Sequence, residues 1–514
     1  MQKHSTTPTV AVSNQNNGND AQDAAERGEN RIKVPETKRP YSIYTKREKW
    51  ILVIMIASSG LFSPLTANVY FPAIPTLARV FNKSVELINL TVTMYMVFQG
   101  ISPMLFGTLA DNVGRRLIYA TCLLILCLSC VGLALVPTNA YWLLLLLRCI
   151  QSAGSASTIA LGAGVIGDIA DASERGGFYG IFQSGPLLGP SIGPVIGGLL
   201  AGSLGWRSIF WFLCISSGVA FILIILFLPE TLRAIVGDGS IQPPIYLRPV
   251  IPILGRRKKQ ATGAAQDQAL PPKKAFKNPF ALLKHLDITI LLIFNGWIVA
   301  VYYAVTATIS TVFASAYPFL NETDIGLCFL SIGGGMLAGS VLSGQFLDSE
   351  YHRFLRKMYP NLDSKEAKEN VRKDEKFPIE EARLRFLPAV MIIYVGCILG
   401  YGWCIEEQVH IAVPLVLHFF IGFTAIFSAT CASTLCIDYV PEQSSSVTAC
   451  NNLIRGSLGA MLVAVIDLMI RRLTVGWAFV LLGCLCAVMT PSVYAVIRLG
   501  PHFRAKRRAQ REKQ

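Results

Sequence analysis

Charged residues are scarce in this sequence. Only 15% of its 514 residues are Asp, Glu, Lys or Arg, whereas 52% are hydrophobic. Soluble domains carry about a quarter charged residues, so this chain has too little charge to cover its apolar surface in water. The composition excludes a water-soluble multidomain enzyme. Apolar stretches of about 20 residues, separated by short charged ones, are typical of a polytopic membrane protein.

The signatures of soluble catalytic and disulfide-bonded proteins are also missing. Most of the 13 cysteines lie inside apolar segments, where they do not form a disulfide framework. The run Gly333-Gly-Gly335 lies within a span and lacks the strand-to-helix setting of a phosphate-binding loop. We find no metal-ligand spacing and no nucleophile triad, and the polar loops are too short to fold a nucleotide-binding domain. The 17-residue C-terminal tail gives little support to a receptor. We therefore expect no enzyme, no cofactor and no metal.

Hydropathy predicts twelve membrane spans, each long enough to cross about 30 Å of hydrocarbon at about 1.5 Å per residue. The first is not a cleavable signal peptide, because a long polar stretch precedes it. The predicted spans are 50–71, 87–109, 117–136, 141–166, 178–201, 208–228, 288–314, 324–347, 386–405, 410–437, 447–470 and 474–497.

The basic residues predict the orientation of these spans. If the N-terminus is cytoplasmic, the cytoplasmic tails and loops hold 39 of the 46 Lys and Arg residues, and the external loops hold 5. Cytoplasmic loops carry the excess of positive charge, so both termini and the central loop are predicted to be cytoplasmic. The net charge of +14 thus records topology rather than nucleic-acid binding. Glycosylation sequons at Asn82 and Asn321 fall in predicted external loops.

The chain therefore divides into two helical bundles with polar connections. The central loop contains the basic cluster Arg256–Lys259, which either binds anionic lipid or only serves as a retention signal and linker. We expect a monomer in the bilayer. The predicted parts are a disordered cytoplasmic tail (1–49), an N-terminal six-helix bundle (50–228), a basic cytoplasmic loop (229–287), a C-terminal six-helix bundle (288–497) with a cytoplasmic loop (348–385), and a basic cytoplasmic tail (498–514).

Three segments of the N-terminal half carry a family resemblance. The segment Gly107-Thr-Leu-Ala-Asp-Asn-Val-Gly-Arg-Arg116 resembles the signature of the major facilitator superfamily. Arg148-Cys-Ile-Gln-Ser-Ala-Gly154 resembles its second signature, with Ser152 in place of a glycine. Gly185-Pro-Leu-Leu-Gly-Pro-Ser-Ile-Gly-Pro-Val-Ile-Gly197 is similar to the motif of its proton-coupled antiporters, with Pro194 in place of a glycine. More closely, the chain resembles the fungal twelve-span drug:proton antiporters, which include quinidine-resistance pumps and citrate exporters.

This resemblance implies a fold and a mechanism. The fold is all-α, with twelve transmembrane helices in two six-helix bundles related by a pseudo-two-fold axis, around a cavity that opens alternately to each side. The first signature implies a gate that locks the outward-facing state through charge pairs. A simple positive-inside hairpin is the alternative interpretation. The gating residues would be Gly107, Asp111, Gly114, Arg115 and Arg116.

The antiporter motif forms a stripe of small residues, because positions four apart lie on one face of a helix. The eighth span repeats the spacing at Ser331, Gly335, Gly339 and Ser343. Because the family fold packs the fifth span against the eighth, we expect these two stripes to form the sliding seam between the halves. The motif residues are Gly185, Gly189, Pro190, Gly193, Pro194 and Gly197.

Arg148 and Arg455 are basic residues that topology does not explain. A charge in the middle of a span costs at least about 2.5–3.5 kcal/mol, so each needs a watery cavity, a partner or a role. Polar stripes at helical spacing accompany both arginines, in spans that line the cavity in the family fold. The predicted cavity residues are Arg148, Gln151, Ser155, Arg455, Asn451, Asn452, Gln99, Asn295, Tyr302 and His418.

The charge of this predicted cavity favours an anionic substrate. No Asp or Glu lies in the middle of spans one to eleven, so the substrate itself would supply the carboxylate that a guanidinium prefers. We therefore expect export of an organic anion such as a citrate-like carboxylate. Alternatively, the arginines cap backbone carbonyls or serve proton coupling. A broad-specificity drug or secondary-metabolite pump is the rival interpretation, and it would use the aromatic residues Tyr95, Tyr302, Tyr303, Phe419 and Phe423.

The resemblance leads us to expect coupling to protons. We expect the protein to lie in the plasma membrane. His418 titrates in the physiological range when unperturbed, and Asp111 and Asp168 are alternative proton carriers. Uncoupled export of an anion stays open, because the membrane potential favours it by about 2.3 kcal/mol per charge per 100 mV.

Overall fold

The computed structural model describes residues 41–170, 174–254, 279–359, 377–440 and 444–512. Within these ranges the regular structure is entirely helical. Twelve helical segments of the described chain are long and apolar enough to cross a membrane. This confirms the predicted all-α membrane fold. The predicted tail as far as residue 40 and the basic cluster Arg256–Lys259 lie outside the described residues.

The N-terminal half contains six spans, of which the first is broken into short helices. It consists of α2 (Lys46–Gly60), α3 (Phe62–Asn68), the 3₁₀ turn η1 (Phe71–Ala73) and α4 (Ile74–Val80). The other five spans are α5 (Val85–Val113), α6 (Arg115–Leu135), α7 (Tyr141–Ile169), α8 (Arg175–Leu204) and α9 (Arg207–Phe227). The short elements α10 (Arg233–Val236), η2 (Ile245–Leu247) and η3 (Pro279–Lys284) belong to the connection between the halves.

The C-terminal half contains the other six spans. They are α12 (Leu286–Ala316), α13 (Glu322–Met358), α15 (Ile379–Leu384) with α16 (Leu387–Glu406), α17 (Ala412–Tyr439), α18 (Ser444–Leu473) and α19 (Val475–Glu512). Two of these helices extend far past the predicted spans. The eighth span continues to Met358, into the predicted loop 348–385, and the last continues to Glu512, through the predicted tail.

Local sequence explains where several helices begin and end. At the start of α2 the Thr45 side chain accepts from the Glu48 N–H, and the Glu48 carboxylate accepts from the Thr45 N–H, which forms a capping box. Asn321 and Asp324 form the same arrangement at the start of α13. Gly114 ends α5 with a φ of 131°, a backbone conformation that residues with a Cβ rarely adopt.

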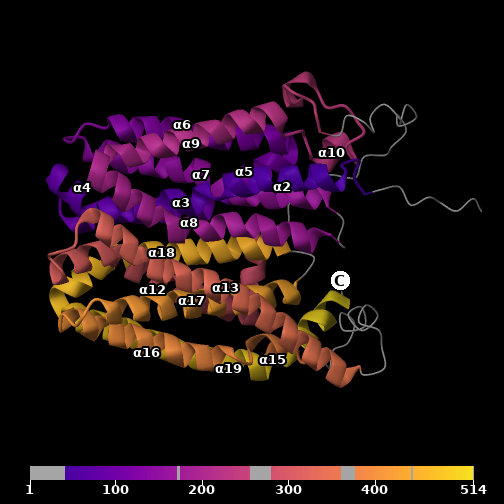
Figure 1. Cartoon of the computed structure of the whole chain (residues 1–514). Coiled ribbons are helices and arrows are strands. Elements are labelled where there is room, and N and C mark those ends of the chain that lie inside the picture. Colours follow the sequence, from indigo (N-terminus) through magenta and orange to yellow (C-terminus); the bar gives the residue numbers. More distant parts are fainter. Residues whose placement is uncertain (1–40, 171–173, 255–278, 360–376, 441–443, 513–514) are drawn as a thin grey trace, which may run out of the picture. The chain divides into compact units, whose positions relative to one another are not determined.

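The two halves lie one above the other in Figure 1, with the N-terminal half in indigo to magenta and the C-terminal half in orange to yellow. Within the first half, α5 packs on α7, and α6 on α7 and α9. Within the second, α13 packs on α17, and α16 on α17 and α19. The main contacts between the halves are α5 with α18 and α8 with α13, which are equivalent under a pseudo-two-fold exchange.

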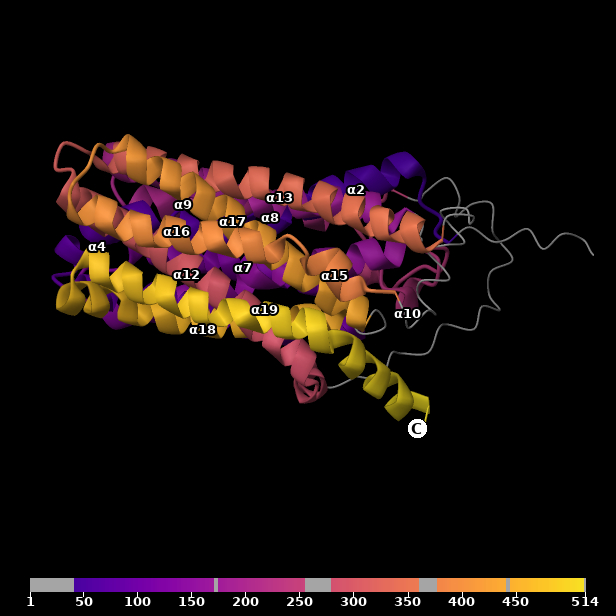
Figure 2. The same cartoon turned by 90° about the horizontal axis from the view of Figure 1, so that it is seen from below.

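The helices have two ends, to which we give names. The basic end holds the start of α2 at Lys46, the α5–α6 junction at Gly114 and the end of α9 at Phe227. The far end holds the end of α4 at Val80 and the start of α13 at Glu322. Figure 2 shows the C-terminal part of α19 leaving the array at the basic end.

Candidate functional site

Arg148 lies in the interior of the N-terminal half, where α7 meets α5 and the broken first span. Its side chain is fully buried. The guanidinium carbon lies 4.3 Å from the ring centroid of Tyr70 and 4.4 Å from that of Tyr95. Nη1 donates to Gln151 Oε1 at 2.6 Å and to the Thr66 carbonyl at 3.4 Å. The two aromatic rings and two neutral oxygens therefore hold the charge.

The environment of Arg148 leaves part of its hydrogen-bonding capacity unused. Nε and Nη2 are buried and find no acceptor among the described residues. No carboxylate of the described chain lies within ion-pair distance of this guanidinium. Cation–π contacts are worth about 2 kcal/mol or more when desolvated, which offsets only part of the cost of burying a charge. The N-terminal half thus encloses a cation that has no anionic partner in the part of the chain that the structure describes.

Hydrogen bonds close the polar face of α7 against its neighbours. The Tyr95 hydroxyl lies 2.7 Å from Ser155 Oγ and donates to the Ser63 carbonyl at 3.0 Å. Gln151 Nε2 donates to Cys130 Sγ at 3.2 Å. Gln151 and Ser155 are fully buried, as is Arg148. These residues do not line an open cavity in this conformation, because the polar face of α7 packs against Tyr95 of α5 and Cys130 of α6.

The polar residues of the C-terminal half form a second group. Asn295 of α12 donates from Nδ2 to Asn451 Oδ1 of α18 at 2.6 Å and lies 3.4 Å from Ser433 Oγ of α17. Asn295 itself is buried, whereas Asn451, Asn452 and Arg455 are partly exposed. The structure therefore brings together Asn295 and Asn451 from separate spans, as expected for one polar site.

The close contact of α5 with α18 places more predicted residues beside this group. A Cβ at Gly100 would lie 3.4 Å from the Asn452 carbonyl oxygen, and one at Gly456 would lie 2.9 Å from the Met96 carbonyl oxygen. Gln99, next to Gly100, is partly exposed and donates to Ser63 Oγ at 3.3 Å. Gln99 and Asn452 therefore lie near the same seam, from opposite halves.

Arg148 and Arg455 do not share a contact in this conformation. The residues that hold Arg148 all come from the N-terminal half. The backbone of Arg455 lies against Gly296 of α12, in the C-terminal half. A substrate that contacts both arginines would require the side chain of Arg148 to become accessible.

Two further predicted residues are buried within the C-terminal half. His418 is fully buried, with its ring centroid 4.6 Å from that of Tyr401 and 5.5 Å from that of Phe313. Both ring nitrogens lack a partner among the described residues. Tyr302 is buried beside Tyr303, at 5.5 Å between centroids. We predicted both His418 and Tyr302 as cavity residues, but in this conformation neither has appreciable contact with solvent, because neighbouring side chains enclose them.

The gating signature forms a charge network at the basic end. Arg115 lies 2.5 Å from Asp111 Oδ1 and 3.1 Å from Asp168 Oδ2 of α7. Glu230, after α9, accepts from the N–H groups of Arg115 at 2.9 Å and Arg116 at 3.2 Å. Among the described residues, none of these contacts involves the C-terminal half. The signature therefore does not bridge the halves in this conformation.

The shape of the α5–α6 junction explains its glycine and its second arginine. A Cβ on Gly114 would lie 2.6 Å from Glu230 Oε2, so only glycine fits both the space and the φ of 131°. Arg116 donates to the Ile225 carbonyl at 2.7 Å, which fixes α6 to the end of α9. Gly107, by contrast, has open space where a Cβ would be, so the structure gives no packing reason for it.

The antiporter stripe packs differently from our prediction. A Cβ on Gly185 would lie 2.3 Å from the Ala57 carbonyl oxygen, and one on Gly197 would lie 2.1 Å from that of Val69. Gly189 and Gly193 likewise face the first span, at residues 64–65 and 68–69. The stripe therefore packs α8 on α2 and α3 inside the N-terminal half. The prediction that it forms the seam with the eighth span was wrong.

The matching stripe on α13 also packs within its own half. A Cβ on Gly335 would lie 1.9 Å from the Phe419 carbonyl oxygen of α17, and Gly339 faces Phe423. Ser331 donates to the Leu415 carbonyl, which also belongs to α17. Four-residue spacing identified the small face correctly, but it did not identify the neighbouring helix.

Other small residues form the α8–α13 contact between the halves. A Cβ on Gly333 would lie 2.4 Å from Ser191 Cα, and one on Gly198 would lie 2.9 Å from Gly326 Cα. The Pro194 carbonyl oxygen would lie 2.8 Å from a Cβ on Gly326. Pro194 of the antiporter motif thus reaches this seam, as do glycines that the motif does not include. Pro190, the other motif proline, lies inside α8 and is partly exposed.

Polar contacts between the halves gather at the far end. Thr76 donates to the Glu322 carboxylate across the halves, and Arg79 lies 3.7 Å from the same group. Glu86 of α5 pairs with Arg471 of α18 at 2.7 Å. Among the described residues, the ion pairs of the basic end each stay within one half. The conformation is therefore held shut at its far end.

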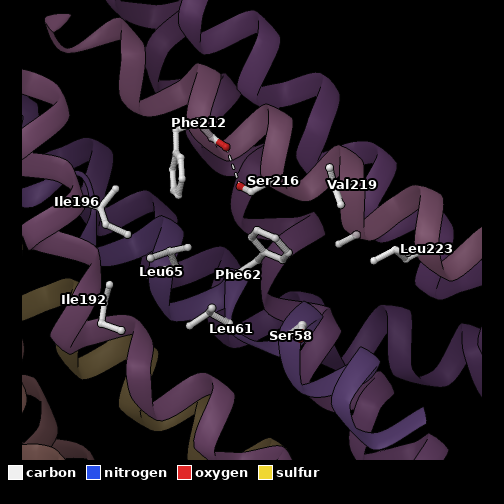
Figure 3. Close-up of a pocket in the computed structure, with 11 residues that line it drawn as sticks. Ser58, Leu61, Phe62, Leu65, Ile192, Ile196, Phe212, Ser216, Val219 and Leu223 are labelled. Atoms are coloured by element: carbon white, nitrogen blue, oxygen red, sulfur yellow. Dashed lines mark hydrogen bonds between the residues drawn. The ribbon is translucent and has the colours of Figure 1, made fainter. Parts of the chain in front are cut away.

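A separate cavity of about 290 Å³ lies between α2, α3, α8 and α9 in the N-terminal half. Figure 3 shows its lining, in which Phe62, Leu65, Ile196 and Phe212 point toward the space. Its one hydrogen bond among the drawn residues is from the Ser216 hydroxyl to its own helix. None of the predicted polar residues line it, so this cavity offers apolar contact and no charged recognition.

Comparisons with known proteins agree with the fold and the motifs. Citrate exporter 1 of Aspergillus niger is 38% identical over 475 residues, which cover 91% of this chain and 89% of that protein. Multidrug transporter QDR2 of Candida glabrata is 34% identical over 495 residues, covering 92% and 84%. The crystal structure of a D-xylose-proton symporter superposes with a TM-score of 0.61 at 14% identity, over 87% of this chain and 97% of that one, and shows the fold alone.

The family model of the Major Facilitator Superfamily matches residues 56–464, which include all three signatures and extend from the first span into α18. The chain is a membrane transporter of the Major Facilitator Superfamily.

Proposed function

We propose that the protein exports a small organic anion, a citrate-like carboxylate, by proton-coupled alternating access. The observation that carries this proposal is the buried guanidinium of Arg148, in which Nε and Nη2 have no acceptor and which has no carboxylate partner among the described residues. A carboxylate on the substrate is the partner that a guanidinium binds best. The similarity to Citrate exporter 1 supports the same substrate class.

Recognition would involve both halves. Arg455, Asn451 and Asn452 are partly exposed at the α5–α18 seam and offer a charge and two amides to an anion. Arg148 would join them once Tyr95 and the first span shift as the halves rock. In the conformation shut at its far end, the substrate would enter from the basic end, which we assign to the cytoplasm from the excess of Lys and Arg there. We place the protein in the plasma membrane.

Broad-specificity drug export is the second candidate. The similarity to Multidrug transporter QDR2 and the aromatic pair Tyr302 and Tyr303 favour it. A drug pump for cations would, however, have to hold its substrate near Arg148, beside which the described residues place no carboxylate. The two candidates therefore predict opposite effects on transport when the charge of an arginine is removed: anion export should fall, and export of a cationic drug should not.

Counterflow in proteoliposomes separates these candidates. We expect Arg455→Gln to lower the exchange of labelled citrate by at least about tenfold, the effect of losing about 1.4 kcal/mol from one charged hydrogen bond. Arg472→Gln is the matched control, because Arg472 is an exposed arginine of the same helix at the far end. Equal citrate exchange by the two variants would overturn the proposal. So would a wild-type protein that exchanges a lipophilic amine but not citrate.

A further inference from the structure

Asn89 and Asp467 meet across the two halves near the far end. Asn89 Nδ2 of α5 donates a hydrogen bond to Asp467 Oδ2 of α18. Asn89 is fully buried and Asp467 is 7% exposed. Because the two residues belong to different halves, this contact exists only while the α5–α18 seam is shut. An opening at the far end would separate them and expose the carboxyl group to solvent.

Few other charges surround Asp467. Glu86 of α5 and Arg471 of α18 are the nearby ionic groups, and they pair with each other at 2.7 Å. The helices α12, α17 and α19 also pack on α18. They carry no Asp, Glu, Lys or Arg in their far-end halves, and His418 of α17 is enclosed by aromatic rings. The hydrogen-bond partner of Asp467 is therefore the neutral amide of Asn89 and not a cation.

The amide of Asn89 has an unused acceptor. Its Oδ1 is buried and receives no hydrogen bond from the described residues. A primary amide and a carboxylic acid can exchange two hydrogen bonds, N–H to carbonyl oxygen and O–H to amide oxygen. An ionised carboxylate can only accept, so it leaves the amide oxygen unsatisfied at a cost of about 1–3 kcal/mol. A proton on Asp467 would provide the missing donor.

We propose that the Asn89–Asp467 pair is a proton-binding site at which closure of the far end takes up one proton from the solution on that side. An O–H bond forms on the Asp467 carboxylate, no other covalent bond changes, and the proton leaves when the seam opens and water reaches the carboxyl group. Acid on the far side then favours the shut conformation. Because the far side both supplies and receives this proton, the site makes the balance of shut and open molecules depend on the pH of that side, and it does not itself carry the proton of the proposed coupling across the membrane.

Distance measurements on purified protein without substrate test the site. Nitroxides on keto-bearing residues at positions 83 and 472, both exposed at the far end and in different halves, leave the native cysteines in place. Double electron–electron resonance between pH 8 and pH 5 should show the shut population growing as pH falls, by up to about tenfold in the ratio of states per pH unit for one proton.

Variants identify the titrating group. Asp467→Asn, which keeps the amide contact but cannot ionise, should give a shut population that no longer depends on pH. Glu407→Gln, at an exposed carboxylate of the far end outside the seam, should retain the full dependence. Glu86→Gln should retain it as well, because Glu86 is already paired with Arg471. A pH dependence that survives in Asp467→Asn, or that disappears in Glu86→Gln, would overturn the proposal.

A conservative variant covers the case in which Asp467→Asn does not give monodisperse protein. Asp467→Glu retains a titrating carboxyl group and moves it by one methylene, so it should shift the midpoint of the pH dependence. An unshifted midpoint would also overturn the proposal. Because no substrate is present, this result is independent of the substrate assignment, whose failure would show in the counterflow assay alone.

Discussion

The three consecutive glycines of α13 point in three directions, and this makes the α8–α13 seam testable. A Cβ on Gly333 would lie 2.4 Å from Ser191 Cα, across the halves. Carbon atoms in contact are separated by about 3.5–4.0 Å, so Gly333→Ala would push the two helices apart by about 1 Å. Overpacking of this kind costs about 1–3 kcal/mol, which corresponds to about 5- to 150-fold in the ratio of shut to open molecules.

The neighbouring glycines provide matched controls. Gly334 has nothing within 4 Å of a Cβ, so Gly334→Ala should leave the ratio unchanged. Gly335→Ala would meet the Phe419 carbonyl oxygen at 1.9 Å inside the C-terminal half. It should lower the thermal unfolding temperature in detergent, because the clash lies between two helices of the same half.

The nitroxide distance between positions 83 and 472 reports the ratio of conformations for each variant. We expect Gly333→Ala to shift the distribution toward longer distances, while Gly334→Ala superposes on the parent protein. Indistinguishable distributions for Gly333→Ala and Gly334→Ala would refute the argument that this close approach belongs to the shut state.

Three further predictions concern single residues. Gly114→Ala should lower the thermal unfolding temperature, because the φ of 131° costs about 1–3 kcal/mol for a residue with a Cβ and the added atom would meet Glu230; an unchanged unfolding temperature would contradict this. Asp111→Asn should reduce transport while surface delivery stays intact, because its proposed role is to stabilise the outward-facing state, whereas here it pairs with Arg115 of its own half; full transport would show that it is not part of the gate. His418→Gln should leave the pH dependence of transport unchanged, since aromatic rings enclose His418, and a lost dependence would restore it as a proton carrier.

Sequence alone predicted the twelve spans and identified Arg148 as a charge inside one of them, because both inferences depend on the cost of placing polar groups in hydrocarbon. It did not predict the enclosure of Arg148. Tyr70 lies between α3 and η1, where the first span departs from a regular helix, so helical spacing gives no direction for its side chain. Only the folded first span shows that Tyr70 and Tyr95 hold the guanidinium between them.

The seams show a second limit of sequence patterns. Four-residue spacing correctly identified one small face of α8, formed by Gly185, Gly189, Gly193 and Gly197. However, α8 packs against both the first span and α13, and spacing alone does not tell which of them the stripe contacts; it contacts the first span. The Asn89–Asp467 contact was missed for a related reason, since its members are 378 residues apart. Asn89, an amide between Ile88 and Leu90 near the start of the second span, was the available signal.

Exchange of labelled citrate by the wild-type protein tests the central claim most directly. Proteoliposomes loaded with unlabelled citrate should take up labelled citrate in a saturable way, above protein-free vesicles, and an excess of a lipophilic amine should not compete. Exchange of the amine without exchange of citrate would contradict the assignment of Arg148 and Arg455 to an anionic substrate.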